Sequence, residues 1–117
     1  MPIGYYPYGL TEPVLPQVPP IWRGLEGYVP VFATAAIPAA GGIVVVNYVG
    51  RGILMSTNHA IGANPVTTRI DIDGVTIVNS TQVPESAMYL IGFATSLWVQ
   101  MVSGGAGGGG MVVYIHE

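Results

Sequence analysis

The sequence predicts an all-β fold, an eight-stranded sandwich or jelly roll that follows an extended proline-rich N-terminal arm. Short runs of β-branched and aromatic residues recur about every ten residues and are separated by turn residues, a spacing typical of sandwiches and barrels. No 11-residue window carries a helical period that is free of proline and glycine. Between two alternating runs, Asp73-Gly74 forms a strong hairpin signal.

The hairpin at residues 67–79 is the best-defined local element. Asp73 and Gly74 are suited to the two positive-φ positions of a type I′ turn, and a two-residue loop fixes the strand register. Ile70, Ile72, Val75 and Ile77 are expected on one face of the hairpin, and Asp71 and Thr76 on the other. The predicted cross-strand pairs are Ile72 with Val75, Ile70 with Ile77, and Asp71 with Thr76.

The remaining strands are expected at residues 28–35, 43–49, 53–57, 87–94, 97–102 and 111–116. Pro30 makes the first of them an edge strand, because proline lacks the N–H that a central strand must donate. Residues 58–65 are predicted as a polar loop, and residues 103–110 as the glycine-rich tip of a hairpin between the last two strands. Both faces of these last strands are largely apolar, so the outer face is expected to be covered by the arm or by another chain.

Residues 1–27 are predicted to form a separate extended arm, and residues 28–117 the sandwich domain. Six prolines in the first 20 residues favour polyproline II over helix or central strand. The arm is apolar and aromatic, unlike a disordered tail, which is usually polar and charged. We therefore expect it to lie on a protein surface, with a linker that packs on nothing as the alternative. Its expected anchors are Tyr5, Tyr6, Tyr8, Leu10, Leu15 and Trp22.

Charge is scarce in this chain. Only 8% of the 117 residues are charged, there is no lysine, and the net charge is −3. Such a chain cannot cover a whole monomer surface with charge, so much of the surface is expected either to be buried against other subunits or to face lipid. The absence of a basic patch argues against nucleic-acid binding. Two long charge-free stretches, 27–50 and 86–115, contain too many prolines and glycines for a membrane helix, so a membrane-spanning helix is not expected and a membrane partner is unlikely.

No catalytic set, cofactor site or metal site is expected. The glycine run at 103–110 lacks the Lys-Ser/Thr that a P-loop requires. Asp71 and Asp73 resemble the start of a calcium loop, but Val75 and Gln82 stand where further oxygen ligands belong. His59 and His116 have no neighbours at metal-ligand spacing. The chain is therefore predicted not to be an enzyme.

The run from Val49 to Ile77 resembles a pattern in small β-sandwich modules of tailed-phage and related virions. A Gly50-Arg51-Gly52 bend leads into a strand, a polar loop follows, and a later strand ends at the Ile72-Asp73-Gly74 turn. The arm is similar to those by which capsid decoration and minor capsid proteins hold their neighbours. This resemblance implies a virion structural subunit of the head, its decoration or the tail, commonly trimeric and without catalytic residues.

Two other functions remain open at this point. A lectin-like carbohydrate-binding module would use exposed aromatic rings as a stacking platform. A membrane-associated β protein would turn its charge-free strands toward lipid. The candidate platform residues are Tyr5, Tyr6, Tyr8, Trp22, Tyr48, Tyr89, Trp98 and Tyr114.

Overall fold

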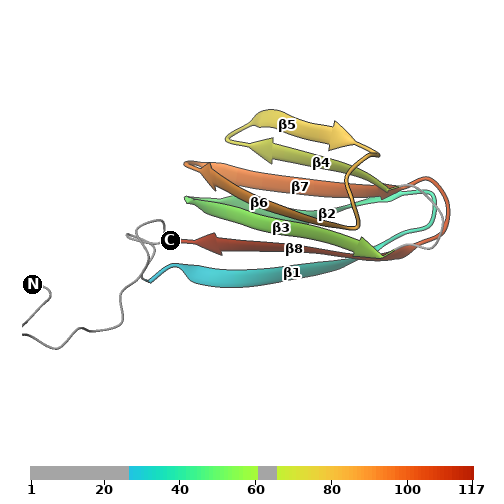
Figure 1. Cartoon of the computed structure of the whole chain (residues 1–117), viewed down its shortest axis with the longest axis horizontal. Coiled ribbons are helices and arrows are strands. Elements are labelled where there is room, and N and C mark those ends of the chain that lie inside the picture. The colour runs from blue at the N-terminus through green and yellow to red at the C-terminus, as the bar shows by residue number, and fades with distance from the viewer. Residues whose placement is uncertain (1–26, 61–65) are drawn as a thin grey trace, which may run out of the picture.

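A computed structural model describes residues 27–60 and 66–117, and it confirms the all-β prediction. Eight strands form two four-stranded antiparallel sheets that pack against each other, and the described residues contain no helix (Figure 1). The strands are β1 (Val29–Ile37), β2 (Gly42–Val49), β3 (Gly52–Ala60), β4 (Val66–Ile72), β5 (Val75–Ser80), β6 (Ser86–Phe93), β7 (Ser96–Ser103) and β8 (Gly108–His116).

The chain moves from one sheet to the other at almost every connection. One sheet has the order β1-β8-β3-β6 and the other has the order β2-β7-β4-β5. Among the described strands, only β4 and β5 are consecutive in the chain and paired with each other. Each sheet is therefore built from strands far apart in sequence, and β1 is an edge strand, as Pro30 predicts.

The core lies between the sheets and is made by every second residue of each strand. On β7, Leu97, Val99 and Met101 are fully buried, while the alternate side chains face outward. Leu54 from β3 and Ile70 from β4 are equally buried on the facing sheets. Each such side chain stabilises the fold by about 1.5–3 kcal/mol on burial, and truncation of Leu97 to alanine would cost about 2–5 kcal/mol.

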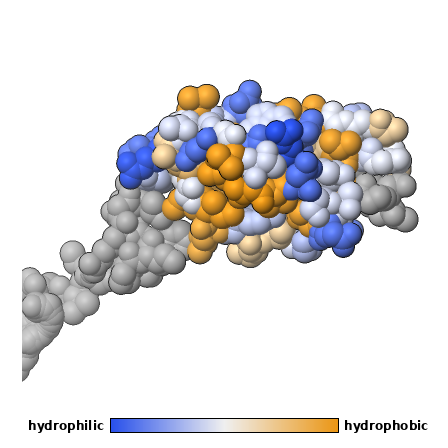
Figure 2. Space-filling view, turned by 90° about the horizontal axis from the view of Figure 1, so that it is seen from above, coloured by the Kyte–Doolittle hydropathy of each residue, from blue (hydrophilic) through white to orange (hydrophobic). Residues whose placement is uncertain are grey.

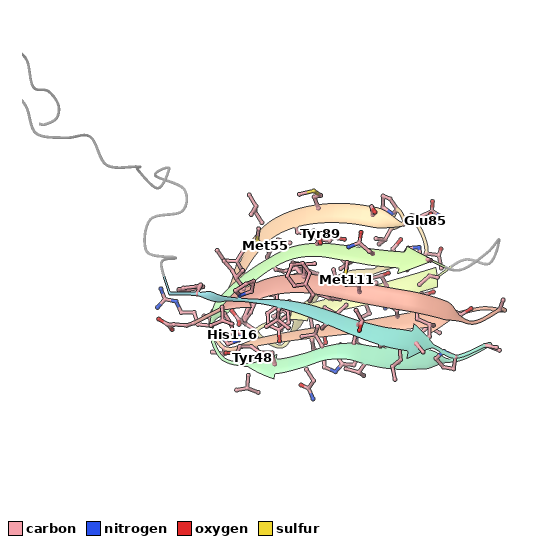
Figure 3. The ribbon with its side chains drawn as sticks, turned by 90° about the horizontal axis from the view of Figure 1, so that it is seen from below. Tyr48, Met55, Glu85, Tyr89, Met111 and His116 are labelled. Atoms are coloured by element: carbon pink, nitrogen blue, oxygen red, sulfur yellow. The ribbon has the colours of Figure 1, made fainter. Side chains whose placement is uncertain are left out.

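Aromatic rings close one end of the sandwich. Tyr48 of β2 contacts rings of β8 across the core, with its centroid 4.8 Å from that of His116 and 5.6 Å from that of Tyr114. Phe93 of β6 packs edge-on against Tyr48 at 6.1 Å. Tyr48 and His116 lie at the opposite end of the molecule from Glu85 (Figure 3).

The β4–β5 hairpin differs from the predicted register at one position. Asp73 and Gly74 have φ values of 53° and 83°, the conformation that a type I′ turn requires. The pairs Ile72 with Val75 and Asp71 with Thr76 are present, but Ile70 pairs with Val78. A β-bulge between Ile70 and Asp71 shifts the register, so the predicted pair of Ile70 with Ile77 is wrong. Ile77 and Val75 are exposed.

The predicted hairpin between the last two strands is also wrong. β7 and β8 belong to different sheets, so the glycine-rich segment between them is a crossover. The chain itself holds this segment: the Ala40 N–H donates to the Gly105 carbonyl oxygen at 2.6 Å, and the Gly105 N–H donates to Ser103 Oγ at 3.1 Å. A Cβ at position 107 would lie 2.7 Å from the Ile37 carbonyl oxygen, so only glycine fits there.

Two strands extend further than predicted. β8 begins at Gly108, and β3 continues through Ala60, because their backbones pair in this stretch without help from side chains. Residues 58–60, predicted as loop, are thus strand. The rest of that loop, 61–65, lies outside the described residues, and so does the arm except for Gly27. The predicted anchors outside the described residues are Tyr5, Tyr6, Tyr8, Leu10, Leu15 and Trp22.

Candidate interaction surface

The outer face of the β1-β8-β3-β6 sheet is hydrophobic across all four strands. Strand register places Phe32, Val113, Ser56 and Met88 in one row, and Pro30, Ile115, Ile53 and Gly92 in another. Because side chains alternate along each strand, these rows face away from the core. We call this surface the apolar face and define it by its hydrophobic members: Pro30, Phe32, Ile53, Met88, Leu90, Met111, Val113 and Ile115.

Several of these side chains are largely exposed in the isolated chain. Met88 is 83% exposed, Phe32 65% and Leu90 56%. The face holds no charged side chain along its four strands, and its polar members are Thr34, Ser56, Asn58 and Ser86. A space-filling view shows hydrophobic residues grouped across the middle of one side of the molecule (Figure 2).

The apolar face is large for a chain of this size. The whole outer face of the sheet, four strands about 4.8 Å apart and about 30 Å long, covers roughly 500–600 Å², which the hydrophobic members share with Thr34, Ser56, Asn58, Ser86 and glycines. Patches of this extent lie at the upper end of what monomeric proteins expose, and they commonly mark binding surfaces. The face therefore has the size and chemistry of a protein interface.

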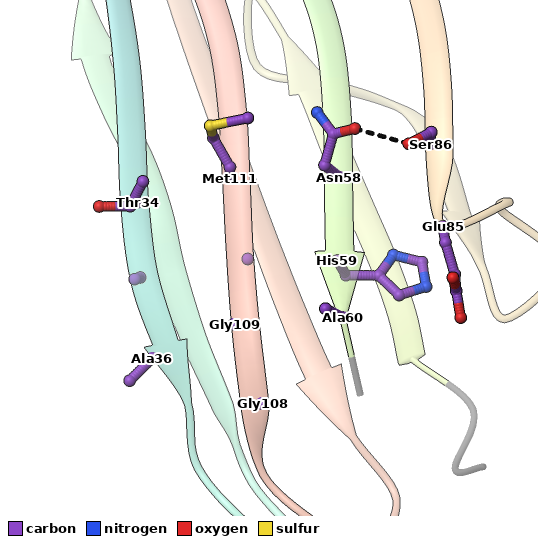
Figure 4. Close-up of a pocket in the computed structure, with 12 residues that line it drawn as sticks. Thr34, Ala36, Asn58, His59, Ala60, Glu85, Ser86, Gly108, Gly109 and Met111 are labelled. Carbon is purple, nitrogen blue, oxygen red and sulfur yellow. Dashed lines mark hydrogen bonds between the residues drawn. The ribbon is translucent and has the colours of Figure 1, made fainter. Parts of the chain in front are cut away.

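A concavity of about 800 Å³ lies at one end of the apolar face. Its floor is formed by backbone and small side chains, because Gly108, Gly109 and Gly110 of β8 run between Ala36 of β1 and Ala60 of β3 (Figure 4). A Cβ added at Gly109 would meet no atom within 4 Å. The hollow is thus left by missing side chains and is open to a group from outside.

Polar groups line the β6 side of this concavity. The Ser86 hydroxyl donates to Asn58 Oδ1 at 2.8 Å, and the His59 N–H donates to the Glu85 carbonyl oxygen at 2.9 Å (Figure 4). His59 Nδ1 is buried and has no hydrogen-bond partner in the described structure. The Ser86 hydroxyl and the Asn58 amide are the side-chain groups at this rim that can hydrogen-bond the polar tip of an inserted side chain.

The two histidines lie far apart in the described structure. His59 pairs with Gly110 at one end of β3, while His116 pairs with Gly52 at the other. Seven residues of strand separate these positions, roughly 23 Å, so the two imidazoles cannot share a ligand. Within residues 27–60 and 66–117 no three His, Cys, Asp or Glu side chains cluster where they could hold a metal ion.

The outer face of the β2-β7-β4-β5 sheet has a different character. We call it the polar face and define it by its polar and aromatic members, Asn47, Arg69, Asp71, Thr76, Asn79, Trp98 and Gln100; it also exposes Val44 (41%) and Val49 (81%). The Arg69 guanidinium donates to both carboxylate oxygens of Asp71, at 3.1 and 3.2 Å, and the Thr76 hydroxyl donates to Asp71 Oδ1 at 2.8 Å. Burial acts to raise the pKa of Asp71, but these hydrogen bonds and the Arg69 charge together lower it below its ordinary value.

Trp98 is not available as an open stacking platform. The Arg69 guanidinium lies over its ring, 5.0 Å from the centroid, in a cation–π contact. Tyr114 is buried, and Tyr48 packs among the rings at the end of the core. Among the platform candidates within the described residues, these three rings are therefore engaged by the chain itself.

Asp73 ties the two sheets together at one end of the sandwich. Its Oδ1 accepts from the backbone N–H groups of Ala94, Thr95 and Ser96 at 2.9, 2.7 and 3.1 Å, so the β4–β5 turn holds the β6–β7 connection. These backbone hydrogen bonds lower the pKa of Asp73 to about 2. Sequence analysis identified Asp73 as a turn residue but missed this contact, because its partners lie more than 20 residues away.

The sequence interpretation also missed the most exposed members of the apolar face. Met88 and Leu90 alternate with Tyr89 and Ile91, which pack against the core, so β6 is apolar on both sides. The sequence of β6 is apolar at both odd and even positions, but a covered outer face was predicted only for the last two strands. No pattern of large apolar residues marks Phe32, because the residues that follow it in β1 are small and mostly alanine.

No protein-family model matches the chain, and no curated protein is significantly similar to it. The described residues also hold no helix long and apolar enough to cross a membrane. The case for a function therefore rests on the surfaces of the molecule.

Proposed function

We propose that this chain is a non-enzymatic structural subunit of a virus particle, of the capsid decoration, minor capsid or tail type, which assembles by covering its apolar face with other protein. The observation that carries the proposal is the large uncharged outer face of the β1-β8-β3-β6 sheet. The favoured state is a homo-oligomer, with a trimer first, in contact with other particle proteins.

The strand order supports a jelly-roll assignment. Two four-stranded antiparallel sheets ordered β1-β8-β3-β6 and β2-β7-β4-β5 correspond to a jelly roll of two interleaved Greek keys. Jelly rolls recur in viral capsid proteins, but also in lectins and cupins, so the fold alone does not select the function. The resemblance of the segment from Val49 to Ile77 to virion modules favours the capsid role among these.

Surface energetics support assembly. Covering about 1,000 Å² of apolar surface, counted on both partners, contributes on the order of 25 kcal/mol before association and ordering costs are subtracted. The face carries no charge that would have to be desolvated along its strands. Met88 and Leu90 at its rim are therefore suited to burial.

Native mass tests this proposal. Sedimentation of the full chain at micromolar concentration should give a discrete oligomer, about 37 kDa if three 12.2 kDa chains associate. Purified particles from the source of the chain should contain it in a fixed ratio to the other structural proteins. A chain that sediments as a monomer at all concentrations, and is absent from particles, contradicts the proposed function.

The apolar face also favours a second candidate, a membrane-associated β protein that turns this face toward lipid. A flotation assay separates the two functions. The assembly role predicts that the oligomer stays in the protein fraction when it is mixed with neutral and anionic vesicles. Flotation of the chain with vesicles, together with loss of the oligomer, would favour the membrane role.

A further inference from the structure

We propose that the apolar face is the receptor for residues 1–22 of a second copy of this chain, an inference that rests on the proposed assembly function. The arm supplies the hydrophobic groups and the sheet supplies the surface. The reasons for this occupant are the chemistry of the arm, its length, and the point at which it joins the sandwich.

The arm is suited to a sheet face rather than to a sheet edge. Prolines at positions 2, 7, 13, 16, 19 and 20 have no N–H, so the arm cannot complete a ladder of hydrogen bonds as an added strand. An extended proline-rich segment binds instead through its side chains. A hydrophobic sheet surface meets that requirement, and the exposed side chains of Phe32, Met88 and Leu90 provide it.

The arm and the face match in charge. Residues 1–22 contain one charged side chain, Glu12, and the apolar face contains none. The arm therefore adds little charge that must be desolvated, whereas the polar face presents Arg69 and Asp71. This contrast selects the β1-β8-β3-β6 sheet as the receptor.

Length and attachment favour a second copy over the arm's own sheet. The arm joins the sandwich at β1, an edge strand of the same sheet. At about 3.1 Å per residue in polyproline II, 26 residues span roughly 80 Å. The face is only about 30 Å long and holds about ten extended residues, so the remaining length of the arm is needed only if the arm has to cross to another copy. The same length easily reaches the face of a neighbour.

The concavity at residues 108–110 provides a place for an aromatic anchor. Glycine backbone and the Ala36 and Ala60 methyl groups form a flat floor, and Asn58 and Ser86 stand at its rim. A tyrosine ring can lie on such a floor while its hydroxyl reaches a polar rim group. The arm offers three tyrosines and one tryptophan in its first 22 residues.

Photo-cross-linking of the full chain tests this inference. A benzophenone amino acid replaces Met88 on the apolar face, and in the control it replaces Val49, which is 81% exposed on the other sheet. Isotopically heavy and light chains are mixed, irradiated and digested with trypsin. The only cleavage sites are Arg23, Arg51 and Arg69, so the arm is released as peptide 1–23.

The expected product joins peptide 1–23 of one isotope to peptide 70–117 of the other, and a probe at position 49, which lies in peptide 24–51, should give no product that joins peptides 1–23 and 24–51. Mixed-isotope cross-links from position 88 to residues 24–117 would overturn the inference while leaving the assembly role intact. Cross-links between peptides of the same isotope alone would place the arm on its own sheet and also overturn it. A monomeric native mass would remove the proposed function and this inference together.

Discussion

The two outer faces of this sandwich show how one fold can present opposite surfaces. On the polar face, Arg69, Asp71, Thr76 and Trp98 satisfy one another through hydrogen bonds and a cation–π contact. On the apolar face, Phe32 and its neighbours have no such partners within the described chain. In both sheets the side chains alternate between the core and the outside. The two faces therefore differ only in which residues stand at the outward positions. The polar face combines a charged, hydrogen-bonded cluster with the exposed Val44 and Val49, whereas the apolar face carries no charge along its strands and is better suited to be covered by another protein.

A charge on the apolar face should produce the largest effect. Leu90→Asp places a carboxylate where a partner is expected, and burial of an unpaired charge costs about 3 kcal/mol or more. The association constant should fall about 100-fold or further, with the sandwich still folded. Val49→Asp, on the other sheet, should keep the native mass. Sedimentation of both variants measures this contrast, and equal behaviour would mean that the two faces do not differ in function.

Filling the concavity should have a smaller effect. Gly109→Val adds a β-branched residue where the sandwich has open space, so the Tm should hold or rise. Excess volume in a packed interface costs about 1–3 kcal/mol, so assembly should weaken roughly 5- to 150-fold. Gly92→Val, whose Cβ would also fit, lies at the other end of the same apolar face and shows whether the effect belongs to the concavity or to the face as a whole. A concentration series of native mass distinguishes the two variants.

On the polar face, truncation should change stability rather than assembly. Trp98→Ala removes the surface that Arg69 covers, which should lower the free energy of unfolding by about 1–2 kcal/mol. The oligomer should persist when the variant is folded. Urea denaturation with native mass on the same sample checks both points, and loss of the oligomer from the folded variant would show that the polar face is also an interface.

The junction between the sheets should show a pH dependence. The pKa of Asp73 is lowered from 3.8 to about 2, so its carboxylate stabilises the folded state above about pH 4, and this contribution is lost as the pH falls toward 2. Asp73→Asn keeps a residue that tolerates positive φ but removes the charge. Its Tm should be a few degrees below that of the parent at pH 7, and the two should converge near pH 2. A constant difference across this range would mean that the charge is not the cause.

Local features of the fold were predictable from the sequence, and non-local ones were not. Alternation located all eight strands, and Asp73-Gly74 located a turn. The bulge beside Ile70 had no local signal, because it depends on how β4 pairs with both of its neighbours. The glycine run at 103–110 fits a hairpin as well as a crossover, and only packing against Ile37 and Ala40 distinguishes them. Contacts such as that of Asp73 with Thr95 join segments that lie 22 residues apart in the chain, so no local pattern predicts them.

The sequence predicted that the chain has a surface covered by other protein, but not the full extent of that surface. Low charge indicated that some face must be covered, and the sequence pointed to the last two strands, of which only β8 belongs to the apolar face. In strands that are apolar on both sides, such as β6, the inward face is chosen by the opposite sheet: Phe93 packs in the core, while Met88 remains outside. That choice is a property of the assembled sandwich.

Methionine oxidation in the native assembly tests the central claim most directly. Met88 is 83% exposed in the isolated chain, whereas Met101 is fully buried in the core. If other protein covers the apolar face, peroxide should convert Met88 to its sulfoxide nearly as slowly as Met101 under native conditions, and both should react rapidly after unfolding. Fast oxidation of Met88 in the native full chain, with Met101 still protected, would contradict the account.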